Sequence, residues 1–433
     1  MSVIEAPPTV PDPAPAPEPP SARTVRSNKM RRAALIGLGL FVILSFVRLV
    51  TDSSQLTASI TVGAALRATI PILLAGLAAL WADRVGIVNI GIEGMMILGT
   101  WFGGYAAWQW GAYVGVVFAV VGGVIGGLIH GIAVTRFNVD HIISGVAINI
   151  LALGAMRYLS ELIFVGEQGG GITQSPQQSS SIGKVSLPFL SGGWDTPDAL
   201  GNLEERGWFL ISDAAGIIRG LTVDVSYLSI LAILLVPLSA WILWRTRFGL
   251  RIRSSGEQPY AAESLGVKVA PLRYWAMAIS GGLAGLGGGF LAIVATSFYR
   301  QGQTQQRGFI GLATAIFGNW RPSGVLGGAS LFGFGEALQL VGSAAVPKLF
   351  LVFAIIGAIA AVRAAVQRNY RVALVLAAIG GLSLIAFVTV DEVPEPLTKS
   401  VPFVLTIVVL ATSAQRLRPP AHDGKPFRSG EEH

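Results

Sequence analysis

The stretch DRVGIVNIGIEGMMILGT, from Asp83 to Thr100, separates two apolar runs of the chain. It carries the charged or amide side chains Asp83, Arg84, Asn89 and Glu93 among several glycines, which permit bends of the backbone. Non-helical backbone at membrane depth is tolerated only where protein buries it or where it lines a cavity. If the flanking runs cross a membrane, the stretch predicts a helix break that is buried or lines a path.

The composition places the chain in a membrane. Hydrophobic residues make up 52% of the sequence and charged residues 13%, whereas a soluble domain has about 25% charged residues. The absence of cysteine excludes disulfides and thiolate sites, and the four histidines have no metal-ligand spacing, so we expect no metal. The net charge of +7 is typical of cytoplasmic loops rich in arginine and does not indicate nucleic-acid binding.

Apolar runs of the length that crosses a bilayer recur along the chain, and in lipid such runs form helices that satisfy their own backbone. We predict an all-α, polytopic membrane protein with about twelve transmembrane helices. The run at 306–320 is short, so a re-entrant segment is the alternative to a full crossing there. The predicted spans are 33–50, 61–81, 91–109, 112–134, 141–165, 226–246, 272–297, 306–320, 323–341, 347–364, 372–390 and 398–414.

Arginine in short loops marks the cytoplasmic side. With twelve crossings, the arginines at 245–253, 363–371 and 416–418 fall on the same side as the basic residues at 23–32. A re-entrant 306–320 would move the arginines at 363–371 to the outside. We therefore predict twelve crossings, or their equivalent, with both termini in the cytoplasm.

The predicted permease domain covers residues 33–420. Two segments that flank it and one segment between its spans differ from the rest in composition. Residues 1–32 are rich in proline and predict a disordered cytoplasmic tail, and residues 421–433 a polar tail. The segment 166–225 is acidic and rich in Gly, Ser and Gln, and it falls outside in this topology. It is either an idle spacer or a surface that contacts another protein.

The cytoplasmic loop 248–272 contains a short predicted helix. Gln258 precedes Pro259, which suits the first helical turn, and Gly266 is a natural C-terminal stop after PYAAESL. Ala261 and Ala262 are small enough to let this amphipathic helix approach a partner closely. The alternative is an ordinary interfacial helix.

Glycines mark the rest of this region. Gly249 and Gly256 predict tight turns, and the stripe SGGLAGLGGG at 280–289 predicts close packing of membrane helices. The sequence LSGGW at 190–194 resembles the start of the signature loop of ABC ATPases. It lies in the external loop, however, and the chain has no Gly-x4-Gly-Lys-[Ser/Thr] phosphate loop, so we expect no nucleotide site.

Polar residues inside membrane spans are costly and often line a pathway. For Asn149 the alternative is an interhelical hydrogen bond, and for the stretch 83–100 it is a purely structural break. Asp83 and Arg84 are expected at the cytoplasmic edge or paired with each other. The candidate path residues are Asn89, Glu93, Ser144, Asn149, Glu336 and Gln339.

Four motifs occur in an order that resembles the permease subunits of bacterial ABC importers for nucleosides and simple sugars. They are AGLAALWADRVGIVNIGIEGMMILGTWFG (75–103), VDHIISGVAINILALG (139–154), GLRIRSSGEQPYAAESLGVKV (249–269) and RGFIGLATAIFGNWRPSGVLGGASLFGFGEALQL (307–340). Within this family, the likeness is to the branch partnered with lipoproteins of the basic-membrane-protein type, and NIGIEGMM resembles the second of its two permeases. The resemblance covers 60–340 and 394–420.

The resemblance implies a role for each part. The segment 256–266, with Gln258, Pro259, Ala261, Ala262, Glu263 and Gly266, corresponds to the coupling helix that docks on the ATPase. It implies as partners an ABC ATPase, a second permease, an external binding lipoprotein that delivers a nucleoside or simple sugar, and the lipid bilayer. No cofactor is expected in this chain, because ATP and Mg²⁺ belong to the ATPase.

Two features depart from the family pattern, namely the proline-rich tail and an extra pair of apolar runs within 343–391. We expect the pair to form a peripheral hairpin that preserves the topology. The competing hypothesis for the whole chain is an ion-coupled secondary transporter, with Asp140, Glu93 or Glu336 as proton carrier. A channel or structural membrane partner is a third possibility.

Overall fold

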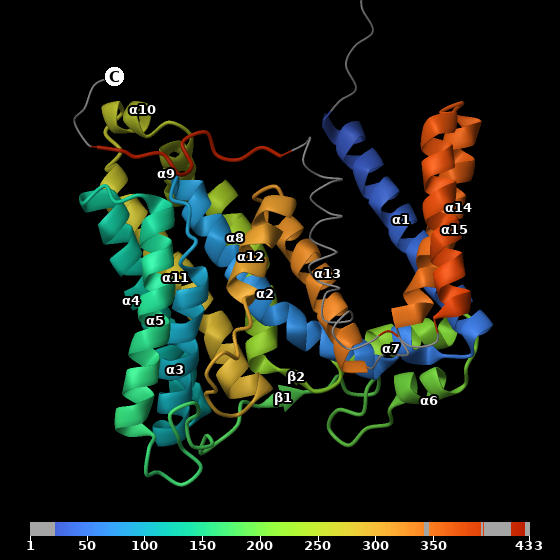
Figure 1. The fold of residues 1–433 in the computed structure, drawn as a ribbon, viewed down its shortest axis with the longest axis horizontal. Helices are drawn as coiled ribbons and strands as arrows, with labels where there is room; N and C mark the ends of the chain where they lie inside the picture. Colours follow the sequence, from blue (N-terminus) through green and yellow to red (C-terminus); the bar gives the residue numbers. More distant parts are fainter. Residues whose placement is uncertain (1–21, 342–345, 391–392, 394–416, 429–433) are drawn as a thin grey trace, which may run out of the picture.

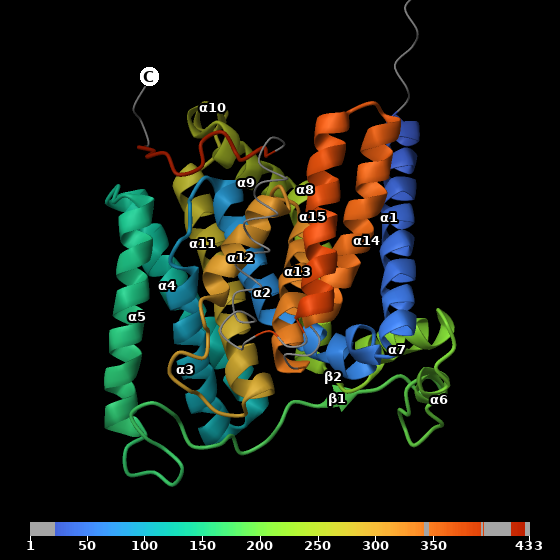
Figure 2. The ribbon, with the colours of Figure 1, turned by 45° about the vertical axis from the view of Figure 1, so that its right-hand side comes forward.

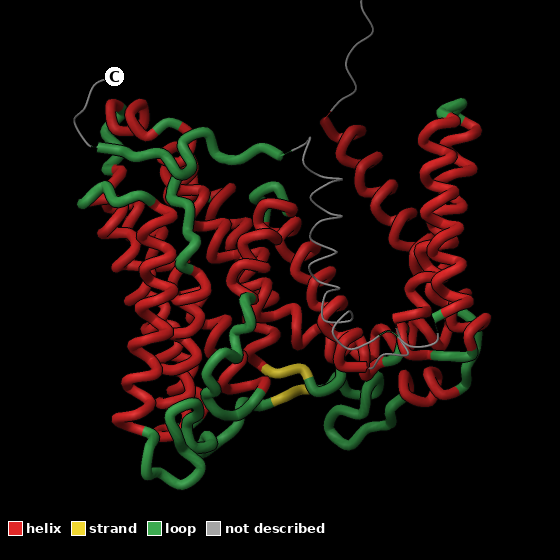
Figure 3. Tube along the Cα trace, viewed as in Figure 1, coloured by secondary structure: helices red, strands yellow, loops and turns green. Residues whose placement is uncertain are grey.

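The computed structural model describes residues 22–341, 346–390, 393 and 417–428. Helices dominate it, and the strand pair in Figure 3 is short. The helices that run between the two opposite sides of the molecule in Figures 1 and 2 are α1 (Ala22–Thr51), α2 (Ser59–Val85), α3 (Ile92–Trp110), α4 (Ala112–Arg136), α5 (His141–Ile163), α8 (Tyr227–Arg245), α11 (Val269–Phe290), α13 (Pro322–Val341), α14 (Val346–Val366) and α15 (Tyr370–Thr389). The shorter helix α12 (Arg307–Phe317) crosses only part of this distance.

The two sides carry different loops. One side, called the α10 side below, holds α9 (Arg247–Glu257), α10 (Pro259–Ser264), the start of α1 and residues 417–428 (Figure 1). The other side, called the α7 side, holds the remaining short elements, and the predicted external and cytoplasmic loops therefore lie on opposite sides. Its elements are η1 (Ser54–Leu56), β1 (Lys184–Val185), α6 (Ala199–Glu205), α7 (Ile211–Thr222) and β2 (Val225–Ser226).

The multi-pass membrane architecture is confirmed. Among the described residues, seven helices are long and apolar enough to cross a bilayer, and two more, at Gly37–Thr51 and Arg307–Phe317, are apolar but shorter. The predicted span 398–414 lies outside the described residues. The short helix α12 begins at mid-height, where the loop after α11 returns from the α7 side, so that α13 starts on the α10 side (Figure 2).

Helices α2 and α11 form the centre of the molecule. In the most apolar stretch of α2, 78% of the residues are buried, and in that of α11, 83%. The corresponding share for α15 is 11%. Glycines let α11 pack closely on α4, because a Cβ on Gly123 or Gly281 would collide with the backbone carbonyl of the other. The close packing predicted from the glycine stripe 280–289 is thus present at its first turn.

Helices α14 and α15 form an antiparallel pair that stands beside α1, apart from the central helices (Figures 1 and 2). Leu351 and Val352 of α14 pack with Val47 of α1 in a separate apolar cluster. The outer face of α15 exposes apolar side chains such as Leu374, at 74%. Exposed apolar surface of this kind suits contact with lipid or with another membrane subunit.

Two sequence predictions need correction. Helix α1 begins at Ala22, inside the tail predicted as disordered over 1–32, because the basic residues after the last proline continue the helix. Gly249 and Gly256 lie within α9 and make no tight turn; they allow close contact instead, since a Cβ on Gly256 would collide with the carbonyl of Arg84. The segment 166–225, which the sequence predicts to lie outside, contains α6 and α7.

Candidate functional site

The stretch that interrupts the helices lies between α2 and α3. Helix α2 ends at Val85, where Gly86 adopts a left-handed φ of 91°, and α3 begins at Ile92. The backbone between them receives side-chain partners: Val88 N–H donates to Nδ1 of His141 at 3.2 Å, and its carbonyl lies 3.2 Å from Nε2 of His130. A break at this depth is stable because protein groups satisfy its backbone.

Asn149 of α5 forms hydrogen bonds on both sides of the first residue of α3. Its Oδ1 accepts a hydrogen bond from the N–H of Gly94 at 2.7 Å, and its Nδ2 donates to the carbonyl of Ile90 at 3.1 Å. A Cβ on Gly94 would lie 2.9 Å from that Oδ1, so only glycine allows this approach. The interhelical hydrogen bond considered for Asn149 is therefore present.

Asn89 and Ser144 also hold the interrupted segment. The Nδ2 of Asn89 donates to Oγ of Ser280 on α11 at 3.0 Å, and Asn89 is fully buried. The hydroxyl of Ser144 lies 2.8 Å from Nδ1 of His130, whose other ring nitrogen meets Val88. Both predicted path residues thus bond to groups that fix the break.

Glu93 connects two helix starts. Its carboxylate accepts hydrogen bonds from the backbone N–H groups of Gln306, at 3.0 Å, and Gly308, at 2.7 Å, at the N-terminus of α12. The same carboxylate lies in the first turn of α3. A negative charge is favourable at the positive end of a helix dipole, and here it faces two such ends.

Of the two alternatives for Asp83 and Arg84, the mutual pair does not form; both residues lie in the last turn of α2 and bind Trp320, which follows α12. Oδ2 of Asp83 accepts from Nε1 of Trp320 at 2.6 Å, and Nη2 of Arg84 donates to its carbonyl at 2.7 Å. Arg84 also lies 3.9 Å from the carboxylate of Glu257 in α9. These two residues therefore attach the end of α2 to the α12–α13 turn and to α9.

A cavity of about 980 Å³ lies between α2, α12, α13 and the strand pair. Glu336 and Gln339 of α13 line it, as does Arg307, whose guanidinium forms an ion pair with Glu336 and donates from Nε to Oε2 at 3.2 Å. The other charged or amide side chains in its wall are Arg67, Lys184, Asp224, Gln305 and Gln306.

The predicted path residues fall into two groups. Glu336 and Gln339 line the cavity, whereas Asn89, Glu93, Ser144 and Asn149 are absent from its wall. Asn149 bonds to the interrupted backbone, Asn89 to α11, Ser144 to His130 of α4, and Glu93 to α12. A path through the second group stays a prediction. Sequence reasoning missed the other charged and amide residues of the wall. Lys184 and Asp224 lie in the loop 166–225 and resemble ordinary loop charges, whereas Arg67 and Arg307 fall inside the predicted spans 61–81 and 306–320, where a charged side chain is itself a signal of a path.

The predicted short helix forms in the loop after α8. It begins at Pro259, Gln258 precedes it as N-cap, and Gly266 has a left-handed φ of 80°, as expected for the residue that ends a helix. Ala262 is buried, whereas Ala261 faces outward. Leu265, which the sequence analysis did not select, is 84% exposed at the helix end and offers an apolar contact.

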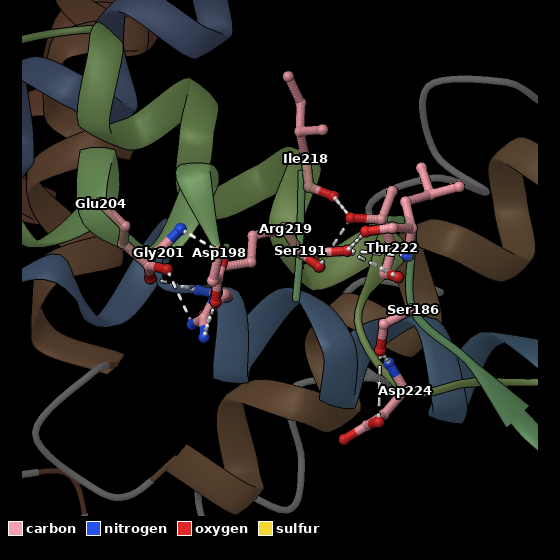
Figure 4. Close-up of polar contacts among 11 residues, drawn as sticks. Ser186, Ser191, Asp198, Gly201, Glu204, Ile218, Arg219, Thr222 and Asp224 are labelled. Atoms are coloured by element: carbon pink, nitrogen blue, oxygen red, sulfur yellow. Dashed lines mark hydrogen bonds and ion pairs between the residues drawn. The ribbon is translucent and has the colours of Figure 1, made fainter. Parts of the chain in front are cut away.

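The α7 side carries a polar cluster that fixes the external segment to α2 (Figure 4). Arg219 of α7 forms ion pairs with Asp198 at 2.7 Å and Glu204 at 3.3 Å, and Oε1 of Glu204 accepts from the N–H of Ser59 at 2.8 Å. Partial burial would raise the pKa of Asp198, but hydrogen bonds from Arg219 and Gly201 hold it below its usual value. This segment is a folded platform.

The comparisons with known proteins agree with this architecture. Residues 61–362 match the family described as branched-chain amino acid transport system / permease component. The chain is 36% identical to the guanosine ABC transporter permease protein NupQ of Bacillus subtilis over 66% of this chain and 83% of that protein. It is 29% identical to the nucleoside ABC transporter permease protein NupC of Lactococcus lactis over 63% of this chain and 79% of that protein.

A third relative is the putative glucose ABC transporter permease protein TsgC13 of Haloferax volcanii, 32% identical over 64% of this chain and 76% of that protein. No solved structure matches the chain. The matched residues include the interrupted stretch, the cavity wall on α12 and α13, and α10. The chain therefore belongs to this family of transport permeases, as its motifs predict, and is a multi-pass membrane subunit of an ABC transporter and not an enzyme.

Proposed function

We propose that the chain imports a nucleoside, with a simple sugar as the second candidate, as one permease of an ATP-driven importer. The observation that carries this proposal is the cavity of about 980 Å³, which combines apolar helix walls with the polar side chains of Arg307, Glu336 and Gln339. Cavities of this size and lining suit small polar solutes. Relatives named for guanosine, nucleoside and glucose transport support the same solute classes.

The proposed partners act from opposite sides of the membrane. An external binding lipoprotein delivers the solute to the α7 side, where the folded platform of α6 and α7 faces outward. An ATPase docks on the α10 side, which is cytoplasmic in the topology predicted from the arginines, and ATP and Mg²⁺ remain in that subunit. A second, different permease completes the pathway. B. subtilis and L. lactis each have two relatives with permease names, and this supports a heterodimer.

Transport in this proposal is a shift between conformers that expose the path to one side at a time. The interrupted segment Gly86–Gly91 links the two halves of the path in this proposal. It contacts Gly256 of α9 and His130 of α4, and it leads into α3, whose Glu93 bonds to the start of α12. The bonds of Asn149, Asn89 and Ser144 hold it in the present conformation.

The proposal is tested by purifying the complete complex, reconstituting it in liposomes and measuring uptake of labelled guanosine, adenosine, uridine and ribose. We expect uptake that needs ATP and the binding lipoprotein and that prefers nucleosides. Uptake by this chain without the ATPase, driven by a proton or sodium gradient, would support a secondary transporter instead. Binding of the same solutes to the isolated lipoprotein identifies the preferred nucleoside.

A further inference from the structure

Residues 417–428, called the C-terminal strap, lie flat along the α10 side of the molecule (Figure 1). The strap starts beside the end of α12, where the N–H of Arg418 donates to Oδ1 of Asn319 at 2.8 Å. It then reaches the corner between α9 and α10, where the N–H of His422 donates to the carbonyl of Gly256 at 2.9 Å. The strap therefore links two elements that are far apart in the sequence.

A buried aromatic side chain anchors the strap. Phe427 is only 2% exposed and packs in one apolar cluster with Ala262 of α10 and Val269 of α11. Its ring centroid lies 5.1 Å from that of Tyr260, and the guanidinium of Arg273 lies 5.0 Å above its face. A cation over an aromatic face is attractive, and more so where water is excluded, as it is around the fully buried Arg273.

The strap also touches the interrupted segment. A Cβ built on Gly424 would lie 3.2 Å from Cγ2 of Val88, and one on Gly86 would lie 3.4 Å from the carbonyl oxygen of His422. Between these contacts, burial and the nearby Asp83 raise the pKa of Asp423 above its ordinary value. The strap is thus packed against the same backbone that Asn149 and His130 hold from the other side.

We propose that the C-terminal strap and α10 together form the surface that binds the ATPase, and that the strap passes the movement of α10 to Gly86 and Val88. This inference rests on the proposed function. The strap covers the inner side of α10, where Ala262 is buried, and leaves Ala261 and Leu265 to the partner. Any subunit that grips the exposed side of α10 therefore meets the strap beside it.

The charge of this surface specifies the partner further. Arg418 and Lys425 of the strap are exposed, and Arg251 of α9 and Lys268 are exposed next to α10. Glu257 and Glu263 lie among these four basic residues, so the surface around the apolar Leu265 has a net positive charge. It fits an ATPase groove whose floor is apolar and whose edge is acidic.

The first experiment uses the fact that the natural chain contains no cysteine. Lys425→Cys and Ala261→Cys are made separately in the complete complex, labelled with a photoactivated maleimide crosslinker and irradiated. We expect both positions to crosslink to the ATPase. Crosslinking from Ala261→Cys but not from Lys425→Cys would overturn the role of the strap and leave the proposed function intact. No crosslink from either position would count against ATPase docking on this side altogether.

The second experiment removes the anchor. Phe427→Ala is expected to reduce the amount of ATPase that co-purifies with the permease by about tenfold, while the permease still inserts and still pairs with its second permease. Phe353→Ala, the same change at a half-exposed position on α14, serves as the control and should retain the ATPase. Full retention of the ATPase by Phe427→Ala, with unchanged ATP-driven uptake, would refute the strap as part of the docking surface.

Discussion

The carboxylate of Glu93 in α3 accepts a hydrogen bond from the backbone N–H of Gly308 in α12 at 2.7 Å and so joins two helices whose starts meet at mid-height. With the second bond, from Gln306, the carboxylate satisfies two of the backbone donors that the first turn of α12 leaves unpaired. The two helices therefore share one cap, and a change at Glu93 acts on both.

Glu93→Gln is expected to destabilise the protein and slow transport, because an amide has one acceptor oxygen and its NH₂ group would face a backbone N–H. Leaving one buried donor unpaired costs about 1–3 kcal/mol. Thermal unfolding of the purified complex in detergent measures the loss. Glu161→Gln, an exposed glutamate on α5, is the control and should unfold like the natural protein. Equal stability of the two variants would mean that the bonds from Gln306 and Gly308 contribute little.

Asn149→Ala is expected to loosen the interrupted segment. The change leaves the N–H of Gly94 and the carbonyl of Ile90 without their side-chain partner, at a cost of about 1–3 kcal/mol per buried group. Hydrogen exchange of the amides from Gly86 to Gly94 measures the effect, and faster exchange is expected there first.

Leu151 lies on the same helix and is 60% exposed. Leu151→Ala therefore tests whether any truncation of an α5 side chain accelerates hydrogen exchange. It should leave exchange in the 86–94 segment unchanged. If both variants accelerate exchange equally, the hydrogen bonds of Asn149 are not what holds the break.

The Arg307–Glu336 pair in the cavity wall predicts a double-mutant cycle. Arg307→Gln and Glu336→Gln each leave one partly buried charge unpaired, and each is expected to weaken transport by about 1.5–3 kcal/mol, or roughly tenfold or more. The double variant should recover part of this loss, since neither charge is left alone. Initial rates of solute uptake at saturating binding lipoprotein provide the measurement. Strictly additive effects would show that the two groups act on the solute independently and do not act as a pair.

The sequence predicted the described helices well because membrane spans are the strongest signal that a chain offers. The predicted starts at 112 and 141 coincide with those of α4 and α5, and the proline and glycine at 259 and 266 correctly bound α10. Each of these signals is local: a capping residue, a helix breaker or a length of apolar chain.

The failures concern contacts between distant residues. For Asp83 and Arg84 the sequence suggested either a place at the cytoplasmic edge or a mutual pair, and neither alternative included Trp320, which binds both. Gly249 and Gly256 suggested turns, but their role depends on the backbone of α8 and α2 packed against them. The C-terminal strap resembled a free polar tail because only one of its side chains, Phe427, is an anchor, and its pocket is built from α10 and α11.

The exposed side of α10 predicts how coupling is lost. Glu263→Arg is expected to uncouple ATP hydrolysis from transport without blocking insertion, and Leu265→Asp to weaken ATPase binding about tenfold or more, equivalent to about 1.4 kcal/mol or more. Leu265→Asp weakens binding because a carboxylate replaces an apolar side chain that is 84% exposed and therefore available to a partner.

Co-purification of the ATPase measures the loss of binding, and the solute-stimulated activity of the ATPase measures the uncoupling. Leu265→Met keeps the apolar contact and should bind normally; equal loss from Met and Asp would point to a structural defect in α10.

The platform on the α7 side predicts a response to acid. Because the pKa of Asp198 is lowered in the fold, its contribution to stability is complete above its ordinary value of 3.8 and is lost as the pH falls through the lower, folded value. Hydrogen exchange of α7, corrected for intrinsic rates, should therefore be constant from pH 7 to about 5 and rise in strong acid.

Asp198→Asn should show faster exchange of α7 already at pH 7 and a weaker rise in acid. The faster exchange corresponds to a loss of up to about 1 kcal/mol in the free energy of opening, the amount expected for a partly exposed pair. The matched control is Asp195→Asn, an exposed carboxylate of the same segment with a left-handed φ of 57° that asparagine also tolerates, and it should behave like the natural protein. An unchanged acid response in Asp198→Asn would show that Asp198 is not the source of the acid sensitivity.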